Sequence, residues 1–218
     1  MTDTRRQRTR QALLDAGLAL FAELPVDAVA VDGIVAKAGV AKGSFYNHFS
    51  SREAFATAIV EDIRRDIEKK IEVANRGVAA PSVRVARAIM LYADYAMRMP
   101  QQALVMGRAD PLQHFDHELN DNVIADIKQG VAEGIFKVGS IEAGKLFLVG
   151  SVRMLILRLA REKDGGVASE LCLEMCTLLL CCLGMQRDDA IQITHCAHTN
   201  QLPQNSCDLP KRCNVTNS

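Results

Sequence analysis

The chain has 218 residues, of which 49% are hydrophobic and 24% are charged, and its formal net charge at pH 7 is zero. This length can bury a sizeable core and hold one domain, or a small domain fused to a larger one. Trp is absent and Pro is scarce, which favours helix over sheet, and the balanced charge excludes a chain that is a polycation as a whole.

The first helix is predicted from an amphipathic pattern that follows a basic start. Apolar residues recur with a helical period at Leu13, Leu14, Gly17, Leu18 and Phe21. Pro25 ends this helix, because the residue before a proline is pushed out of the helical region. No uninterrupted apolar stretch follows the basic start, so no signal peptide is predicted and a cytoplasmic location is expected.

Four arginines stand among the first ten residues against one acid, Asp3. They are Arg5, Arg6, Arg8 and Arg10. A flexible arm that neutralises DNA phosphates or reaches the minor groove would have this composition. A solvated and disordered start would have it as well, so both interpretations stay open.

Two short helices joined at a glycine come next, over residues 31–38 and 41–47. Gly39 stands where a left-handed residue is needed to end the first of them. Behind the first helix, the pair has the layout of a helix-turn-helix, whose second helix enters the major groove of DNA. The start of that helix combines small side chains with free N–H groups, which suit phosphate. The DNA contacts predicted there are Ala41, Lys42, Gly43 and Ser44.

Hydrogen-bonding side chains continue beyond this start, and the aromatic residues between them are expected to pack inward. Phe45 and Phe49 would hold the third helix on the fourth. The other side chains would grip one stretch of phosphate backbone. These further predicted DNA contacts are Tyr46, Asn47, His48 and Arg52. Alternatively, Tyr46 and His48 are half-buried residues at a helix junction.

The fourth helix has the best-marked start, because Ser50 followed by Glu53 fits a capping box. Isoleucines four residues apart continue its apolar stripe to an end near residues 75–77. Further helices are predicted over residues 83–99, 101–107, 111–133, 140–163 and 167–184. From Gln186 onward the sequence becomes polar, and a poorly ordered tail is expected.

The fold class that follows is all-α. We expect a helix-turn-helix DNA-binding domain over residues 1–50 and a helical bundle for effector binding and dimerisation over residues 51–185. The polar tail covers residues 186–218. The apolar run over residues 171–185 contains Glu174 and is shorter than the ~20 residues that span a bilayer, so it predicts a buried helix and no membrane partner.

The N-terminal sequence resembles the TetR family of bacterial transcriptional regulators over about the first 60 residues. The segments "RQALLDAGLALF" and "VDGIVAKAGVAKGSFYNHFSSREAF" match the first four helices of that family in order and spacing. Two departures are Ala30 and Ala41, which stand where Thr or Ser often caps a helix, and a third is Pro25 in place of a common glycine. A lost cap costs about 1 kcal/mol of helix stability.

The resemblance implies an all-helical homodimer that binds a DNA operator and a small-molecule effector. The long fourth helix would link the two domains. Effector binding would spread the recognition helices and release the operator. Proteins of this family usually act as repressors. Lys42, Tyr46, His48 and Arg52 match family positions that touch DNA.

Two later segments indicate how a dimer forms. "KLFLVGSVRMLILRLA" and "ELCLEMCTLLLCCLGM" are apolar on more than one face. Pairing them with copies from a second subunit would give a four-helix interface, so a homodimer through residues 140–185 is predicted. The alternative is that both are central helices of a monomeric bundle.

An effector pocket is expected among the central helices, where adaptable apolar side chains gather. Its predicted lining is Tyr92, Tyr95, Met99, Met106, Phe115 and Phe147. Nothing in the sequence identifies the effector.

Cysteine and histidine residues leave a metal- or redox-responsive regulator as an alternative. Cys172 and Cys176 lie one helical turn apart, and His114 and His117 would share a helix face. The remaining candidates are Cys181, Cys182, His195, Cys196, His198, Cys207 and Cys213. None of the spacings is a zinc pattern, and buried free cysteines act as small hydrophobic residues, so no metal or cofactor is predicted.

The sequence carries no phosphate loop, nucleophile elbow or paired metal motif, and no enzyme is expected. A helical interaction module without DNA binding is the remaining alternative. It would not need the cationic and hydrogen-bonding residues between Lys42 and Arg52.

Overall fold

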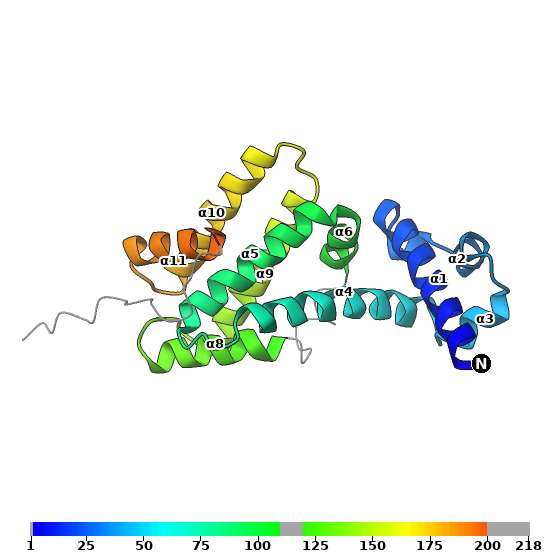
Figure 1. Cartoon of the computed structure of the whole chain (residues 1–218), viewed down its shortest axis with the longest axis horizontal. Helices are drawn as coiled ribbons and strands as arrows, with labels where there is room; N and C mark the ends of the chain where they lie inside the picture. The colour runs from blue at the N-terminus through cyan, green and yellow to red at the C-terminus, as the bar shows by residue number, and fades with distance from the viewer. Residues whose placement is uncertain (1, 110–119, 200–218) are drawn as a thin grey trace, which may run out of the picture.

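The computed structural model describes residues 2–109 and 120–199, and within these ranges every regular element is a helix. Figure 1 shows an elongated molecule with a small N-terminal domain at one end, a long α4 and a larger helical bundle. The elements are α1 (Thr2–Glu23), the 3-10 turn η1 (Val26–Ala28), α2 (Val31–Ala38), α3 (Lys42–Tyr46), α4 (Arg52–Ala74), α5 (Pro81–Arg98), α6 (Pro100–Arg108), α8 (Asp121–Ala132), α9 (Ile141–Leu159), α10 (Gly165–Cys182) and α11 (Arg187–Thr199). The predicted all-α class is confirmed.

A cluster of phenylalanine rings holds α3 against α1 and α4. Phe55 lies 5.2 Å from the ring centre of Phe45, 4.7 Å from that of Phe49 and 5.9 Å from that of Phe21. All four side chains are buried. Gly17 lets the helices approach here, because a Cβ atom at this position would lie 2.4 Å from the Phe55 ring. The inward packing predicted for Phe45 and Phe49 is confirmed.

The turns between the short helices follow the sequence closely. Gly39 ends α2 in the left-handed region with φ of 67°, as expected. Ala30 and Ala41 occupy the N-cap positions of α2 and α3, and neither has a side-chain cap. The helix-turn-helix is therefore stabilised by packing more than by capping.

The start of α4 lies one residue later than predicted. Ser51, not Ser50, is the N-cap, and its Oγ accepts a hydrogen bond from the N–H of Ala54 at 3.1 Å. The reason is that the N–H groups of His48 and Phe49 both bond to the carbonyl of Phe45, which prolongs the preceding turn. The extended residue that a cap requires is therefore Ser51.

The basic N-terminus is helical, so the predicted flexible arm and the alternative of a disordered start are both wrong. Helix α1 begins at Thr2 and includes the arginines. The segment before Gly17 contains no Gly or Pro, and Arg and Gln favour helix. Arg10 also pairs with Asp62 of α4 at 3.3 Å, and it lies over the ring of Phe49 in the turn between α3 and α4.

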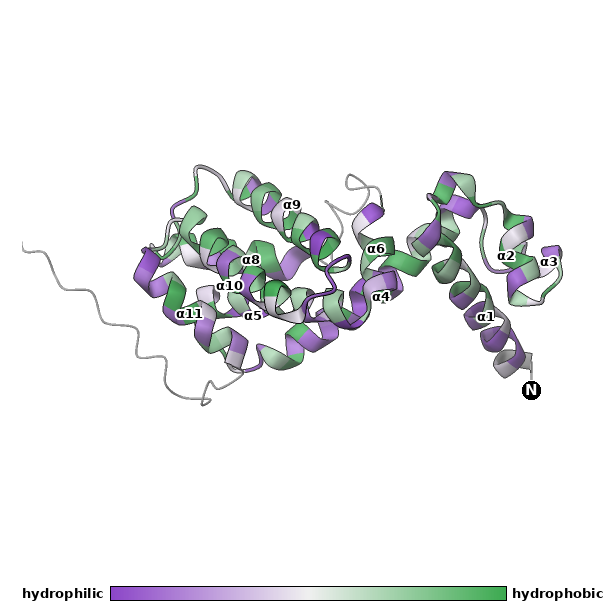
Figure 2. Cartoon of the chain, turned by 90° about the horizontal axis from the view of Figure 1, so that it is seen from above, coloured by the Kyte–Doolittle hydropathy of each residue, from purple (hydrophilic) through white to green (hydrophobic). Residues whose placement is uncertain are grey.

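Helix α5 forms the centre of the bundle, in contact with α4, α6, α8, α9, α10 and α11. Its inward face is buried from Val83 to Ala96. In Figure 2, hydrophobic residues are frequent along α6 and α9, whereas hydrophilic residues dominate the first turns of α1. The bundle core therefore lies between α5 and the helices around it.

The expected poorly ordered tail is wrong over residues 187–199, which form α11. Its inward face buries Ala190, Ile193, Thr194 and Ala197. The hydroxyl groups of Thr177 and Thr194 lie 3.1 Å apart, which joins α11 to α10. The rest of the predicted tail lies outside the described residues.

Helix α10 is, among the described segments, the one that is long and apolar enough to cross a membrane by length and composition. It packs on α5, α9 and α11 through one face, which buries Cys172, Cys176, Leu179 and Leu180, and 33% of the helix is buried. The helix that was predicted as buried is therefore buried on one face.

Candidate nucleic-acid interface and central cavity

The end of the N-terminal domain formed by α3 presents most of the predicted DNA contacts to solvent. Ala41, Lys42, Gly43 and Asn47 are exposed, Ser44 is half-buried, and Tyr46 is 53% exposed. The ring of Tyr46 packs edge-on against Phe45 at 5.3 Å between ring centres. Because buried Phe45 holds that ring by one edge, the phenol of Tyr46 projects from a fixed position.

Lys42 is held by an acidic neighbour on α2. Its Nζ lies 2.7 Å from Oδ1 of Asp32, and both side chains are exposed. The hydrogen bond to Asp32 and then the charge of Asp32 raise the pKa of Lys42. The ion pair points Lys42 to the same surface as Tyr46, and it is open enough for the ammonium to exchange partners.

Arg52 has a more structural position than the sequence indicated. Its Nη1 donates to the main-chain oxygen of Asp27 at 2.9 Å, and its Nη2 lies 2.9 Å from Oε1 of Glu53. The guanidinium therefore ties η1 to the first turn of α4. Its side chain remains 28% exposed.

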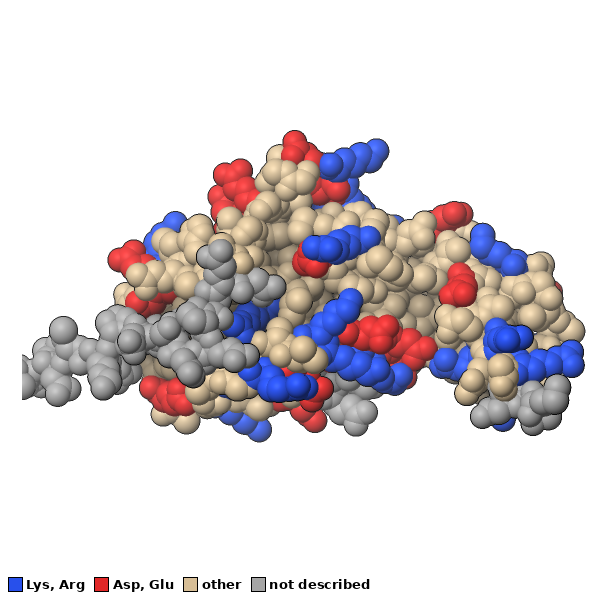
Figure 3. All heavy atoms as spheres, in the orientation of Figure 1, with Lys and Arg blue, Asp and Glu red and all other residues tan. Residues whose placement is uncertain are grey.

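His48 lies where the start of α1 meets the end of α3. Burial lowers the pKa of His48, and the charges of Arg6 and Arg10 lower it further. Arg5, Arg6 and Arg8 are exposed along the same end of α1. Figure 3 shows a group of basic side chains near the lower edge of this end of the molecule. The structure therefore brings Arg6 and Arg10 close to the helix-turn-helix as part of a continuous helix.

A cavity of about 400 Å³ lies in the bundle between α4, α5, α6, α8 and α9. Of the predicted pocket residues, Tyr92 and Met106 line it. Tyr95 and Met99 instead line a smaller pocket of about 170 Å³. Phe147 is 39% exposed on α9, and Phe115 lies outside the described residues.

A polar cluster on one wall of the cavity was not predicted from the sequence. The Tyr92 hydroxyl donates to Oε1 of Glu68 at 2.7 Å, and Nη2 of Arg64 donates to Oδ1 of Asn120 at 2.8 Å. Arg64 and Asn120 are buried. Burial raises the pKa of Glu68, although Tyr92, Arg64 and Asn122 oppose the shift. A carboxylate and a guanidinium thus face one largely apolar space.

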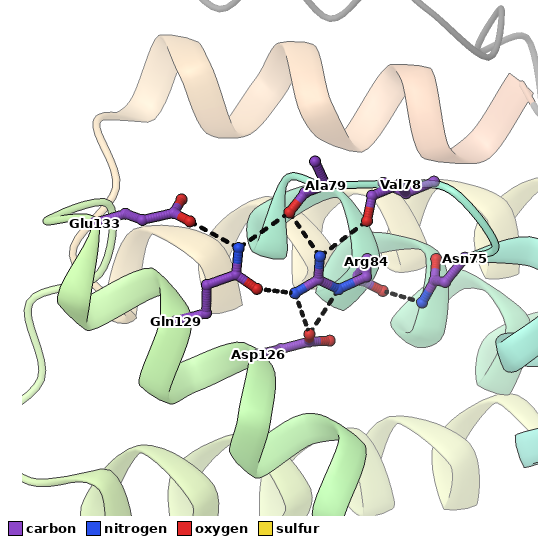
Figure 4. A network of polar contacts seen from close by, with 7 residues as sticks. All are labelled: Asn75, Val78, Ala79, Arg84, Asp126, Gln129 and Glu133. Carbon is purple, nitrogen blue, oxygen red and sulfur yellow. Dashed lines mark hydrogen bonds and ion pairs between the residues drawn. The ribbon is translucent and has the colours of Figure 1, made fainter.

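A second polar network joins α5 to α8 through Arg84 (Figure 4), and its residues Arg84 and Asp126 line the cavity. Its Nε donates to Oδ1 of Asp126 at 2.7 Å and its Nη2 to Oε1 of Gln129 at 2.6 Å. Its Nη1 donates to the carbonyl groups of Val78 and Ala79. Each of the three guanidinium nitrogens of Arg84 therefore has a partner within the protein.

The cysteines of the described part are free thiols. Burial raises the pKa of Cys172 to about 11 and that of Cys176 to about 11, so both stay protonated and weakly nucleophilic at neutral pH. Within the described ranges, no three His, Cys, Asp or Glu side chains form a group that could hold a metal ion. His114, His117, Cys207 and Cys213 lie outside the described residues.

Comparison of the sequence with known proteins identifies the N-terminal domain. Residues 13–59 match the family described as bacterial regulatory proteins, tetR family. The chain is 38% identical over 79 residues to the HTH-type transcriptional repressor DhaR of Mycobacterium sp. strain GP1, which covers 36% of this chain and 40% of DhaR. The match to this curated relative thus spans less than half of its length.

Comparison of the structure extends the likeness to the whole fold. A putative tetR family transcription regulator from Shewanella sp. PV-4 superposes with a TM-score of 0.73 at 16% identity, covering 82% of this chain and 99% of that chain. RolR in complex with resorcinol superposes with a TM-score of 0.61 at 20% identity, covering 88% of this chain and 95% of RolR. The bundle therefore shares its fold with these proteins.

Proposed function

Because its N-terminal domain belongs to the TetR family of bacterial regulatory proteins, we propose that this chain is a DNA-binding transcriptional regulator. It acts in the cytoplasm as a repressor that a small-molecule effector releases from its operator. The observation that carries this proposal is the exposed surface of α3, which presents Lys42 and Tyr46 and packs against the arginine-bearing α1. DhaR, which is similar over this region, is a repressor.

The DNA-facing residues of this proposal divide into two groups. Lys42, Ser44, Tyr46 and Asn47 lie on the α3 surface that would enter the major groove, where Ala41 and Gly43 allow close approach of the backbone. His48, Arg52 and the arginines of α1 lie beside it, where they would contact phosphate and set affinity more than sequence preference. Since α1 is helical from Thr2, its arginines would add contacts without the cost of ordering the backbone.

A homodimer through residues 140–185 fits the surface of the bundle. Helix α9 exposes Phe147 by 39% and Met154 by 64%, and α10, which contacts α9, exposes Leu178 by 52%. Large exposed apolar side chains on two neighbouring helices favour an interface over free solvent contact. Two copies related by a twofold axis would place two α3 helices on one operator with two half-sites.

The central cavity is the proposed effector site. RolR, which shares the fold, was solved with the small molecule resorcinol. Helix α4 supplies Arg64 and Glu68 to the cavity wall, and the same helix packs on the recognition domain through Phe55. A ligand that moves α4 would therefore also move α3, which accounts for release of the operator.

The test is binding to DNA from directly upstream of the gene, measured by fluorescence anisotropy. We expect the wild-type dimer to bind this DNA and a Lys42→Ala, Tyr46→Ala double variant to lose most of that affinity while keeping its helical circular dichroism spectrum. Equal binding by the folded double variant would disprove the DNA-binding surface. A screen of small molecules for release of the bound DNA then tests the effector response.

A further inference from the structure

We propose that the ligand of the central cavity is an uncharged, mostly apolar molecule whose hydroxyl group is held by Glu68 and Arg64 on α4. The hydroxyl is that of an alcohol or a phenol. This inference rests on the proposed function, since it names the class of effector for the same site. It is carried by the size of the cavity, the balance of charge in its lining and the hydrogen-bonding capacity of one wall.

The volume of the cavity and its apolar walls determine the size and the apolar character of the ligand. Apolar side chains such as Val60, Ile89 and Ile156 line most of the space. An apolar cavity of about 150 Å³ holds a benzene ring, so a cavity of about 400 Å³ has room for roughly 15 non-hydrogen atoms. The ligand is therefore small, with one ring or a short chain.

The charges of the lining exclude a net charge on the ligand. Among the described lining residues, the basic ones are Arg64, Arg84 and Arg153, and the acidic ones are Glu68, Glu72 and Asp126. Arg84 and Asp126 neutralise each other in the network that joins α5 to α8. Arg64 and Glu68 lie four residues apart on one face of α4. An ion placed between balanced charges would lose its hydration without gaining a counter-charge.

The polar wall favours a ligand group that both donates and accepts hydrogen bonds. The Glu68 carboxylate accepts from the Tyr92 hydroxyl and from the Asn122 side chain, and a carboxylate has about four acceptor positions. Capacity for a further donor therefore remains at Glu68. Arg64, which hydrogen-bonds Asn120 and Tyr92, places its positive charge one helical turn away.

Groups that only accept or only donate hydrogen bonds satisfy half of this wall. A carbonyl or an ether accepts but cannot donate to Glu68, and a carboxylate would also meet the like charge of Glu68. An ammonium donates but would meet the like charge of Arg64. A hydroxyl group donates through its hydrogen and accepts through its lone pairs, so it fits both neighbours.

The experiment compares matched probes on the full-length dimer by isothermal titration calorimetry. The probes are 4-hexylphenol, its methyl ether 4-hexylanisole, 4-hexylbenzoate and the aliphatic alcohol 1-nonanol. We expect the phenol to bind about tenfold more tightly than the ether, because a hydrogen bond to a charged group is lost in the ether. The benzoate should bind more weakly than the phenol. The affinities for 4-hexylphenol and 1-nonanol then show whether the cavity prefers an aromatic or an aliphatic hydroxyl compound.

A variant locates the effect at Glu68. In Glu68→Gln we expect the preference for phenol over ether to fall to about threefold or less, because the charged acceptor is gone. Asp66→Asn is the matched control, since Asp66 is an exposed acid on the same helix and does not line the cavity. This control should keep the tenfold preference. A circular dichroism melt of each variant checks the fold.

Three results would overturn the inference: equal binding of phenol and ether, tightest binding of the benzoate, or no binding of any probe. Operator binding is measured on the same preparations without any probe. If the protein binds the operator but does not prefer the phenol over the ether, the proposed ligand class is wrong, and the proposed function as a DNA-binding regulator is unaffected. If the operator does not bind, the proposed function fails by itself.

Discussion

Arg108, the last residue of α6, donates a hydrogen bond from its Nη1 to the main-chain oxygen of Ala22 in the last turns of α1, at 3.0 Å. The two residues before it, Met106 and Gly107, line the central cavity. Helix α6 also packs on α4 and α9. One short helix therefore contacts both the cavity and the recognition domain, and Arg108 is its polar link to α1.

Removing that link should loosen the end of α1. In Arg108→Met we expect amide hydrogen exchange in the last turn of α1 to become faster, with a loss of about 0.5–1 kcal/mol in the free energy of unfolding. Arg98→Met is the control, because Arg98 pairs only with exposed Asp94 in the same helix. Unchanged exchange in Arg108→Met would show that apolar packing alone joins α6 to α1.

Two glycines in the N-terminal domain should respond oppositely to alanine. At Gly17 a Cβ atom would lie 2.4 Å from the Phe55 ring, whereas at Gly33 it would meet nothing within 4 Å. Gly17→Ala should therefore lose about 1–3 kcal/mol of stability through overpacking. Gly33→Ala should gain about 0.5–1 kcal/mol, because alanine favours the interior of α2. Urea unfolding measures both, and a stable Gly17→Ala protein would contradict the close packing of α1 on α4.

The helix-turn-helix could be predicted from the sequence because its signals are local. Gly39, the phenylalanines and the spacing of the short helices each have one physical reason that needs no distant contact. The predicted N-cap of α4 was Ser50, one residue before the observed N-cap Ser51. The turn after Phe45 decides which of the two serines has the extended backbone of a cap, and the sequence does not show this turn. Helix α11 did have a local signal at residues 190, 193, 194 and 197, which share one helical face.

The polar wall of the cavity could not be predicted in the same way. Arg64 and Glu68 stand beside the isoleucine stripe of α4 and have the pattern of a solvated face. They are turned inward only because Tyr92 on α5 and Asn120 before α8 pack against them. Such partners lie far apart in the sequence, so the sequence does not show that Arg64 and Glu68 face the cavity. The prediction from apolar character identified only some of the lining residues, among them Tyr92 and Met106.

The stability of the protein should depend on pH through Glu68. Burial raises the pKa of Glu68 above its ordinary value. The folded protein therefore favours the protonated carboxyl group. The contribution of Glu68 to the free energy of unfolding is fully present below its pKa in the unfolded chain, and it is lost as pH rises through its pKa in the folded protein. We expect the stability advantage of Glu68→Gln over the wild type, measured by urea unfolding, to grow as pH rises above the ordinary glutamate pKa. A stability difference that stays constant with pH, as expected for the control Asp66→Asn, would contradict the burial of this charge.

The dimer interface can be tested at Met154, which is 64% exposed on α9. Met154→Glu places a charge where two apolar surfaces would meet, so the mass measured by light scattering should fall to that of a monomer at micromolar concentration. Glu162→Gln lies beyond the end of the same helix and should remain a dimer. A dimeric Met154→Glu protein would place the interface elsewhere, and a monomeric wild type would remove it.

The central claim is that the end of α3 faces DNA, and the pair of Asp32 and Lys42 tests it most directly. Operator affinity is measured by fluorescence anisotropy at several salt concentrations. Lys42→Met should weaken binding and reduce the salt slope by about one, because one phosphate contact is lost. Asp32→Asn should strengthen binding severalfold, because it frees Lys42 and removes a negative charge from the DNA-facing surface. If both folded variants bind the operator as the wild type does, the recognition surface is not at α3.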